Sequence, residues 1–163
     1  MLSRILSKES CANCRFCCSF RRCSLWETPL FDNETAEKLS KKGYSFISDN
    51  GFFRMYLDDK YKTNDENEEV PCYFLDSKKG CILDEDTKPF DCKIWPLRVM
   101  KKEDKLVIAL TPTCKEINKI PLEKMKAFVK DEVGKTIFDY AKNHPYIVKE
   151  YREDFPILIY DEN

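Results

Sequence analysis

The chain has 163 residues, of which 42% are hydrophobic and 13% aromatic, so its length fits one domain with enough apolar side chains for a core. It carries 28 lysines and arginines against 29 aspartates and glutamates, and the net charge of −1 argues against nucleic acid as a partner. No apolar run approaches the ~20 residues of a membrane span, and the first ten residues lack the apolar segment of a secretory signal. We therefore expect one domain over residues 1–163, cytoplasmic, with neither membrane nor nucleic-acid contacts.

One helix is predicted in the first half of the chain. Residues 1–10 read as a short polar lead-in. In residues 33–43, "NETAEKLSKKG", Asn33 is a suitable N-cap, Leu39 falls on the inner face and Gly43 is a typical helix stop. We expect a helix between Asn33 and Gly43.

Extended structure is predicted around several turn sequences. Residues 44–57 alternate apolar and polar side chains on either side of an Asp-Asn-Gly turn, which is typical of a hairpin. The mostly acidic stretch 58–69 is expected to be a solvated loop. Residues 72–83 predict two short extended pieces joined by a Lys-Lys-Gly turn. A second hairpin is predicted over 93–110, where Pro96 weakens or ends one strand.

From residue 121 the apolar residues follow the period of a helix. They recur every three to four positions over 121–143, with Gly134 as a break or kink. A further short helix is expected over 145–154 and a final strand over 155–160. Together these elements predict a small α+β domain with helices at its C-terminal end.

The nine cysteines are distributed unevenly. Five lie in residues 11–23, "CANCRFCCSFRRC", and the other four are isolated. In a reducing cytoplasm cysteines serve as metal ligands or redox groups more often than as disulfides, and an odd number cannot pair completely. Two successive C-x2-C steps can turn three thiolates toward one centre, which suits an iron–sulfur cubane with a distant fourth ligand and equally suits four-coordinate zinc. The short strands and hairpins are then expected to surround a cysteine-ligated metal centre.

Adjacent Cys17 and Cys18 favour the hypothesis that one of them binds a second metal, because consecutive side chains of an extended segment point to opposite sides. Eight candidate ligands would satisfy two metal sites, or one iron–sulfur cluster and one zinc. The candidates are Cys11, Cys14, Cys17, Cys18, Cys72, Cys81, Cys92 and Cys114.

Four other uses of clustered cysteines fit the spacing less well. A bacterial ferredoxin would have a fourth cysteine followed by proline where Arg21 and Arg22 stand. No triplet has the spacing found in radical S-adenosylmethionine enzymes, and finger patterns need a second C-x2-C or a histidine pair. A thioredoxin-like dithiol, Cys11/Cys14 or Cys14/Cys17, lacks the surrounding βαβ pattern.

The combined pattern resembles the CxxCxxCC family of zinc- or iron-chelating proteins, also called YkgJ-type cysteine cluster proteins. The resemblance lies in "CANCRFCC" at 11–18, "CYFLD" at 72–76, "GCILDEDTKPFDCKIWPL" at 80–97 and the late Cys114. It implies a cytoplasmic domain whose cysteines hold iron–sulfur or zinc. Similar cysteine clusters occur in flagellin lysine methylases, so the resemblance also implies that a methyl-transfer or other modifying role is conceivable.

Two features of the first cysteine segment depart from the family pattern. Cys23 has no counterpart in the family motif, and we leave it out of the ligand set. The motif usually has a glycine where this chain has Arg15-Phe16. The arginines of the segment, Arg15, Arg21 and Arg22, either lower thiolate pKa values and offset the charge of a thiolate-held metal or form a solvated basic edge.

The sequence names no catalytic residues. Its one histidine, His144, is expected at a helix end or on the surface. We expect a cytoplasmic metalloprotein with an iron–sulfur cluster of the 4Fe-4S type, with zinc as the alternative or as an additional metal. It would act in redox chemistry or in modifying a peptide, protein or small molecule. A structural zinc-binding interaction protein and a metal storage or delivery protein are the alternatives.

Overall fold

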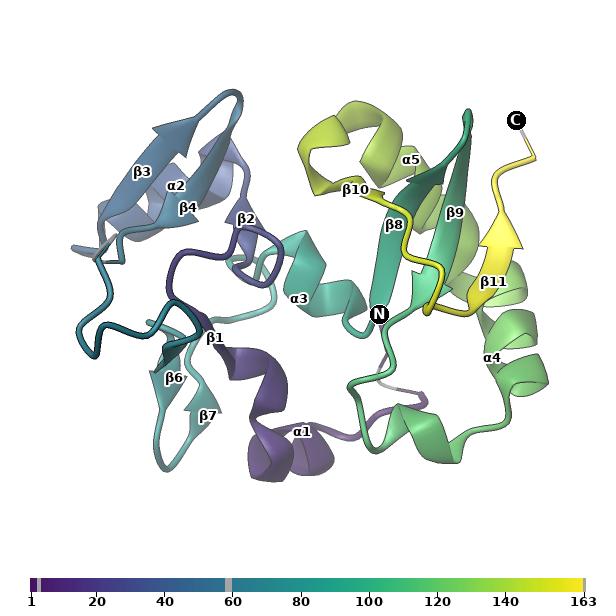
Figure 1. Ribbon diagram of the computed structural model, residues 1–163, viewed down its shortest axis with the longest axis horizontal. Helices are drawn as coiled ribbons and strands as arrows, with labels where there is room; N and C mark the ends of the chain where they lie inside the picture. Colours follow the sequence, from purple (N-terminus) through teal and green to yellow (C-terminus); the bar gives the residue numbers. More distant parts are fainter. Residues whose placement is uncertain (3, 58–59, 163) are drawn as a thin grey trace. The chain divides into compact units, whose positions relative to one another are not determined.

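The computed structural model describes residues 1–2, 4–57 and 60–162, which form an α+β protein of short helices and small sheets (Figure 1). This confirms the predicted fold class and the helices near its C-terminal end. Across the described residues, no helix is long and apolar enough to span a membrane.

Contacts between residues separate the chain into two compact units. The first, called here the cysteine-rich unit, comprises Lys8–Lys93. The second, called the C-terminal unit, comprises Ile94–Asn163 together with Met1–Ser7. Eight of the nine cysteines belong to the cysteine-rich unit, and Cys114 belongs to the C-terminal unit.

The cysteine-rich unit is assembled from short elements (Figure 1). Its helices are α1 (Lys8–Cys14), a 3-10 turn (Phe16–Cys18), α2 (Asn33–Ser40) and α3 (Phe90–Ile94), which ends at the unit boundary. Its strands are β1 (Ser19–Arg21) paired with β5 (Glu69–Pro71), the sheet β2 (Leu30–Phe31), β4 (Phe52–Met55) and β3 (Phe46–Asp49), and β6 (Leu75–Asp76) paired with β7 (Gly80–Cys81). Each of these pairings is antiparallel.

Aromatic side chains form the core of the cysteine-rich unit. Phe20 of β1, Phe31 of β2 and Phe74 are buried in one cluster with Leu39 of α2 and Met55 of β4. The ring centroids of Phe31 and Phe74 lie 5.8 Å apart. Burial of each large apolar side chain stabilises a fold by about 1.5–3 kcal/mol. This cluster therefore joins the small sheets and α2 into one unit.

Helix α2 confirms the prediction for 33–43, with one correction at its start. The N-cap is Asp32 and not Asn33, because the Asp32 carboxylate accepts a 2.7 Å hydrogen bond from a backbone N–H of the first turn. That bond satisfies a donor with no partner inside the helix. Leu39 is buried as expected, and the helix ends before Gly43, whose φ of +93° suits glycine.

Both predicted hairpins and the two short extended pieces are present. The hairpin over 44–57 is formed by β3 and β4, and its turn residues Asn50 and Gly51 have φ values of +39° and +89°. Positive φ at both central residues is what a tight two-residue turn requires. The pieces predicted over 72–83 are β6 and β7. The hairpin predicted over 93–110 lies in the C-terminal unit.

The acidic loop after β4 is anchored by one ion pair. Described residues 60–68 contain no helix or strand, as expected for the loop, while Asp58 and Asp59 lie outside the described residues. Arg22 Nε and Glu68 Oε2 are 2.9 Å apart, and the two side chains are 8% and 12% exposed. The Arg22 backbone N–H also donates to the Glu68 carbonyl. The loop is therefore less solvated at its C-terminal end than predicted.

Two helices differ from the sequence-based expectation. Residues 1–10 are not a polar lead-in, because Leu2 is only 6% exposed and α1 begins at Lys8. Helix α3 begins at Phe90, where no helix was predicted, and it includes the start of the segment assigned to a hairpin over 93–110. Helices of five to seven residues contain at most two turns, too few for a periodic apolar pattern to emerge.

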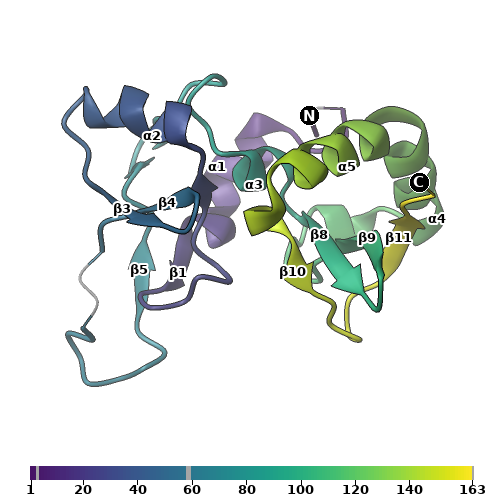
Figure 2. The ribbon, with the colours of Figure 1, turned by 90° about the horizontal axis from the view of Figure 1, so that it is seen from above.

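The C-terminal unit is built on a sheet with strand order β10-β8-β9-β11. Strands β8 (Leu97–Lys102) and β9 (Lys105–Leu110) form the predicted hairpin. Strand β10 (Lys149–Glu150) runs parallel to β8, and β11 (Ile157–Tyr160), the predicted final strand, runs antiparallel to β9. Figure 2 shows α4 (Leu122–Phe128) and α5 (Gly134–Asn143) on one face of this sheet.

The predicted helix over 121–143 is present, with a change of winding in the middle. A π-helical segment, Val129–Val133, joins α4 to α5, which begins at Gly134. A Cβ added at Gly134 would lie 2.5 Å from Cδ1 of Ile159 and 2.7 Å from the Val129 carbonyl oxygen. Glycine at this position therefore allows the helical segment to approach β11 closely.

The helix predicted over 145–154 is wrong. A single 3-10 turn, Pro145–Ile147, is followed by β10, whose Lys149 pairs with Met100 of β8. Pairing with the edge of the sheet satisfies backbone groups that a helix would have satisfied internally. Tertiary contact therefore overrides the local helical pattern here.

Candidate metal centre

Four separate segments of the cysteine-rich unit carry the predicted ligands. Helix α1 and the 3-10 turn that follows it provide the first four cysteines, and three short elements farther along the chain provide one each. The residues are Cys11 and Cys14 in α1, Cys17 and Cys18 in the 3-10 turn, Cys72 directly after β5, Cys81 in β7 and Cys92 in α3.

The pairing of β1 with β5 brings the first cysteine segment to Cys72. Cys18 directly precedes β1 and Cys72 directly follows β5, and the two strands are antiparallel. The Cys72 backbone N–H donates a 2.6 Å hydrogen bond to the Cys18 carbonyl oxygen. Two cysteines far apart in the sequence are therefore neighbours at one end of this strand pair.

The turn between β6 and β7 packs against α1. A Cβ added at Gly80 would lie 3.6 Å from the Cβ of Ala12, which stands between the two cysteines of α1. The Asp76 carboxylate holds this turn by accepting hydrogen bonds from the backbone N–H groups of Lys78 and Lys79, at 2.8 and 2.7 Å. Cys81 follows Gly80 directly, so the turn delivers its thiol to the neighbourhood of α1.

The side chains of Cys17 and Cys18 interact directly. Their hydrogen bond, together with smaller contributions from the positive charges of Lys88 and Arg15, lowers the pKa of Cys18 to about 7, although burial opposes the shift. The same hydrogen bond raises the pKa of Cys17, and burial and the nearby thiols of Cys92 and Cys11 raise it too. The two thiols therefore titrate as a pair.

Burial controls the other two inner thiols. It raises the pKa of Cys72 to about 12, with smaller contributions from Cys18 and Cys81. Burial likewise raises the pKa of Cys92, and the Asp91 carboxylate and the Cys72 thiol add to the effect. At least one other cysteine of the unit therefore raises the pKa of each of these thiols.

These interactions define an inner and an outer group. We call Cys17, Cys18, Cys72 and Cys92 the central thiols, because each of them interacts, as the source or the receiver of a pKa shift, with at least two of the others. Cys11 acts on Cys17, and Cys81 acts on Cys72, so these two exposed cysteines are called the rim thiols.

Two of the eight predicted ligands fall outside these two groups. Cys14 is exposed in α1, and Cys114 is a half-buried residue of the C-terminal unit, in the segment between β9 and a short 3-10 helix. Among the described residues, no three histidine, cysteine, aspartate or glutamate side chains are already arranged as ligands of one metal ion. A metal centre formed by the central thiols therefore stays a prediction.

The donor chemistry of the central thiols fits a thiophilic metal. Four cysteine sulfurs are the ligand set of structural zinc sites and of iron–sulfur clusters. Burial disfavours the thiolate form, and a bound metal ion reverses this balance because it stabilises the thiolate directly. In number and kind, the four residues match such a ligand set.

The three arginines of the first cysteine segment have different partners. Arg15 lowers the pKa of Cys18, in agreement with one of the two roles considered for it. Arg21 forms an ion pair with Glu27, and Arg22 forms one with Glu68, so their charges are offset by carboxylates. Lys88 also lowers the pKa of Cys18; sequence analysis missed it because it is distant along the chain.

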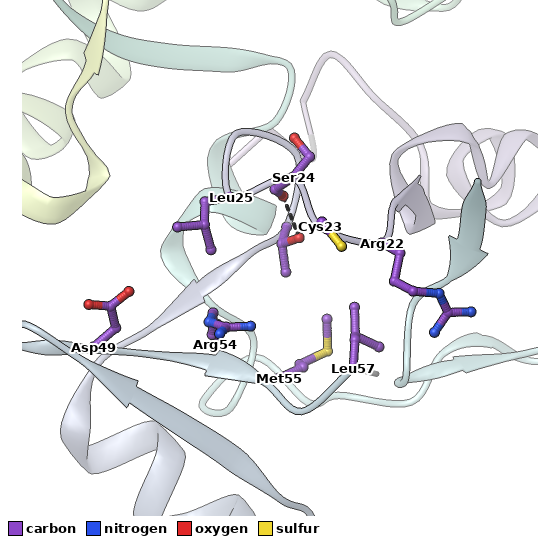
Figure 3. Close-up of a pocket in the computed structure, with 9 residues that line it drawn as sticks. Arg22, Cys23, Ser24, Leu25, Asp49, Arg54, Met55 and Leu57 are labelled. Carbon is purple, nitrogen blue, oxygen red and sulfur yellow. Dashed lines mark hydrogen bonds between the residues drawn. The ribbon is translucent and has the colours of Figure 1, made fainter. Parts of the chain in front are cut away.

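Cys23 lines a separate cavity of about 290 Å³ (Figure 3). The loop after β1 contributes Cys23 and Leu25 to its wall, and Arg54, Met55 and Leu57 contribute from β4 and the residues after it. Figure 3 shows the Cys23 sulfur on the side of this cavity that faces Met55 and Leu57. This position supports leaving Cys23 out of the ligand set.

His144 lies at the end of α5, where it was expected. Its ring stacks on that of Tyr140 with centroids 3.9 Å apart, and its Nδ1 lies 3.0 Å from the Tyr140 carbonyl oxygen. These contacts explain the histidine as part of the helix terminus.

No protein-family model matches the chain, and no curated protein or solved structure matches it significantly. The resemblance to the CxxCxxCC family therefore stays a prediction that rests on the cysteine pattern.

Proposed function

We propose that this chain is a cysteine-ligated metalloprotein whose metal centre lies in the cysteine-rich unit. The observation that carries the proposal is the convergence of four thiols, Cys17, Cys18, Cys72 and Cys92, from three separate segments. Four thiols complete the coordination of one zinc ion or one 4Fe-4S cluster. We infer that these four are its ligands.

A metal role accounts for the grouping of the central thiols better than a packing role does, since Cys18, Cys72 and Cys92 are half-buried and Cys17 is exposed. Lone buried cysteines are common as small apolar residues. Here, however, four thiols from three segments lie close enough to shift one another's pKa values, and Cys17 and Cys18 share a hydrogen bond. A bound metal ion would hold such a set of sulfurs as thiolates.

The remaining predicted ligands belong to a second part of the proposal. The rim thiols Cys11 and Cys81 and the exposed Cys14 are candidates for a second metal site, such as zinc, in the cysteine-rich unit, and Cys114 is a predicted ligand to which we assign no site. An iron–sulfur cluster on the central thiols would support electron transfer or modification of a peptide, protein or small molecule, as the family resemblance implies. A structural zinc protein and a metal storage or delivery protein remain the competing proposals.

Spectroscopy and elemental analysis of anaerobically purified protein test the proposal. We expect brown protein with broad visible absorption, about four irons and four sulfides per chain, and any zinc at about one per chain. Colourless protein with one or two tightly held zinc ions would support the structural alternative, and exchangeable metal below one equivalent would support storage or delivery. Protein without bound metal, which also fails to take up Zn²⁺ or iron and sulfide, would overturn the proposal.

A further inference from the structure

The cavity that Cys23 lines has walls from separate parts of the cysteine-rich unit (Figure 3). One wall is the loop after β1, and another is the end of β4 with the residues that follow it. The volume of about 290 Å³ corresponds to the lower end of the range for small-molecule binding pockets. The cavity is therefore large enough for a small organic ligand.

Strand pairing on both sides fixes the backbone of Arg54 in this wall. Strand β4 is the central strand of its sheet, and Arg54 pairs with Leu30 of β2 and with Ile47 of β3. A guanidinium group has five N–H donors in a planar fork, so it can bind an anion even while it holds another partner. Arg54 therefore brings a positive charge to the cavity from a well-defined position.

The side chains around this guanidinium group are mostly apolar. Figure 3 shows Arg54 with Leu25 on one side of it and Met55 and Leu57 on the other. Met55 is buried in the aromatic core of the unit, Leu57 packs against that core, and Leu25 is 42% exposed. One cation beside an apolar surface suits a ligand that has one anionic group and an apolar tail.

The loop that forms one wall of the cavity is held in shape by its own hydrogen bonds. The Ser24 carbonyl oxygen accepts a 3.1 Å bond from the Thr28 backbone N–H and a 2.6 Å bond from the Thr28 hydroxyl. The Arg21 backbone N–H donates to the Glu27 carboxylate at 2.7 Å. The wall is therefore preformed, and a ligand can bind with little further ordering of the chain.

Two other charged residues line the cavity and differ from Arg54 in their surroundings. The charge of Arg22 is offset by its ion pair with Glu68. Figure 3 shows the Asp49 carboxylate on the far side of Arg54 from Met55. The charge nearest the apolar side chains is therefore the positive charge of Arg54.

We propose that this cavity is a binding site for a small monocarboxylate with an apolar tail. The carboxylate accepts hydrogen bonds from the Arg54 guanidinium group, whose fork matches two carboxylate oxygens, and the tail contacts Leu25, Met55 and Leu57. This inference goes beyond the proposed metal centre and does not depend on it. The described residues that line the cavity include none of the cysteines assigned to that centre.

Titration of the isotopically labelled full chain with hexanoate, followed by NMR chemical shifts, tests the proposal. We expect saturable binding with a dissociation constant on the order of 1 mM for a ligand of this size. The largest shifts should occur at Leu25, Arg54 and Leu57. Neither 1-hexanol nor hexylamine supplies an anion to Arg54, so both should bind roughly tenfold more weakly or less.

Variants at Arg54 test its charge directly. Arg54→Met should bind hexanoate roughly tenfold more weakly, because it keeps an apolar side chain but removes the guanidinium group. Lys38→Met is the matched control for net charge, since Lys38 is an exposed lysine of α2 that pairs with Glu34. It should bind hexanoate like the wild type.

A pair of variants at the exposed Leu25 tests the same charge without altering Arg54. Leu25→Asp places an anion on the wall and should bind hexanoate severalfold more weakly than Leu25→Asn, which has nearly the same shape and no charge. Both substitutions are at an exposed position, so the fold should tolerate them.

Several results would overturn the proposal. They are the absence of saturable hexanoate binding, shifts confined to other parts of the chain, and binding of 1-hexanol or hexylamine as tight as that of hexanoate. Unchanged affinity in Arg54→Met, an equal loss in Lys38→Met, or equal affinities of Leu25→Asp and Leu25→Asn would also do so. None of these results bears on metal content, so the two proposals stand or fail separately.

Discussion

The backbone N–H of Cys72 donates to the carbonyl oxygen of Cys18 at 2.6 Å, at the end of the strand pair β1 and β5. This bond joins the dense cysteine segment near the start of the chain to the first of the isolated cysteines. It makes the strand pair a scaffold for the candidate metal centre. Changes that spare the scaffold but remove a sulfur should therefore abolish metal binding without unfolding the unit.

Cys92→Ser should abolish retention of metal at the central thiols. The hydroxyl group of serine is a poor ligand for zinc and for iron–sulfur clusters, and Cys92 is a central thiol carried on α3. The measurement is the metal-to-protein ratio by elemental analysis after gel filtration, with circular dichroism to confirm the fold.

Cys23→Ser provides the matched control for a lost thiol. Its side chain lines the cavity beside Met55 and Leu57, so its metal content should equal that of the wild type (Figure 3). Full metal content in Cys92→Ser, or loss of metal in Cys23→Ser, would contradict the assignment of the central thiols.

The ion pair of Arg22 and Glu68 should make stability depend on pH. A hydrogen bond from the Lys62 backbone N–H and then one from Arg22 lower the pKa of Glu68 below its ordinary value of 4.5. The carboxylate is therefore favoured in the folded state, and its contribution is complete above pH 4.5 and is lost as the pH falls through the lower, folded value. Thermal unfolding should show Glu68→Gln melting several degrees below wild type near neutral pH, with the difference closing in acid.

Glu66→Gln is the control for this pH dependence, because Glu66 is an exposed carboxylate of the same loop. It should melt close to wild type across the same pH range. A difference between wild type and Glu68→Gln that persists unchanged at low pH would mean that the ion pair is not its source.

Much of the fold follows from local signals in the sequence. The Asp49-Asn50-Gly51 turn specified one hairpin, and the apolar period over 121–143 specified the helices of the C-terminal unit. The prediction was wrong where local preference competes with contacts between distant segments. Residues 145–154 have a helical pattern, yet Lys149 pairs with β8. The short α3 was missed because five residues are too few for a periodic signal.

The candidate site was predictable as a set of residue types but not as an arrangement. Spacing identified eight cysteines, but it could not show that Cys18 and Cys72 meet through β1 and β5, because strand pairing is a long-range property. Lys88 was missed for the same reason. Cys114 illustrates the opposite case, since its position in the C-terminal unit could not be anticipated from the family pattern.

Gly134→Ala should destabilise the C-terminal unit by about 1–3 kcal/mol, the usual cost of overpacking. The added methyl would lie 2.5 Å from Cδ1 of Ile159 and 2.7 Å from the Val129 carbonyl oxygen. Urea unfolding measures the change in the free energy of unfolding.

Replacing Ile159 by valine should relieve part of this cost, because valine lacks the Cδ1 atom. The double variant should be less destabilised than the sum of the two single variants. Strict additivity, or a Gly134→Ala variant as stable as wild type, would show that α5 and β11 do not approach as closely as described.

Asp32→Ala should destabilise the cysteine-rich unit by about 1 kcal/mol, because it removes the side chain that caps α2. Asn33→Ala is the control. It should lower the free energy of unfolding by only a few tenths of a kcal/mol, since the Asn33 side chain donates a hydrogen bond to Glu37 on the exposed surface. Urea unfolding of the two variants decides between the two candidate caps. A larger loss for Asn33→Ala would favour the cap expected from the sequence.

The two compact units differ in how their residues are distributed along the sequence. The cysteine-rich unit is one continuous segment, Lys8–Lys93, whereas the C-terminal unit combines Ile94–Asn163 with Met1–Ser7, including the contact between Arg4 and Glu132. During synthesis from the N-terminus, the cysteine-rich unit can complete its contacts while the rest of the chain is still being made. The segment Met1–Ser7 can form its contacts only after Ile94–Asn163 has been synthesised. The order of translation thus allows the cysteine-rich unit, with the proposed metal centre, to fold before the C-terminal unit exists.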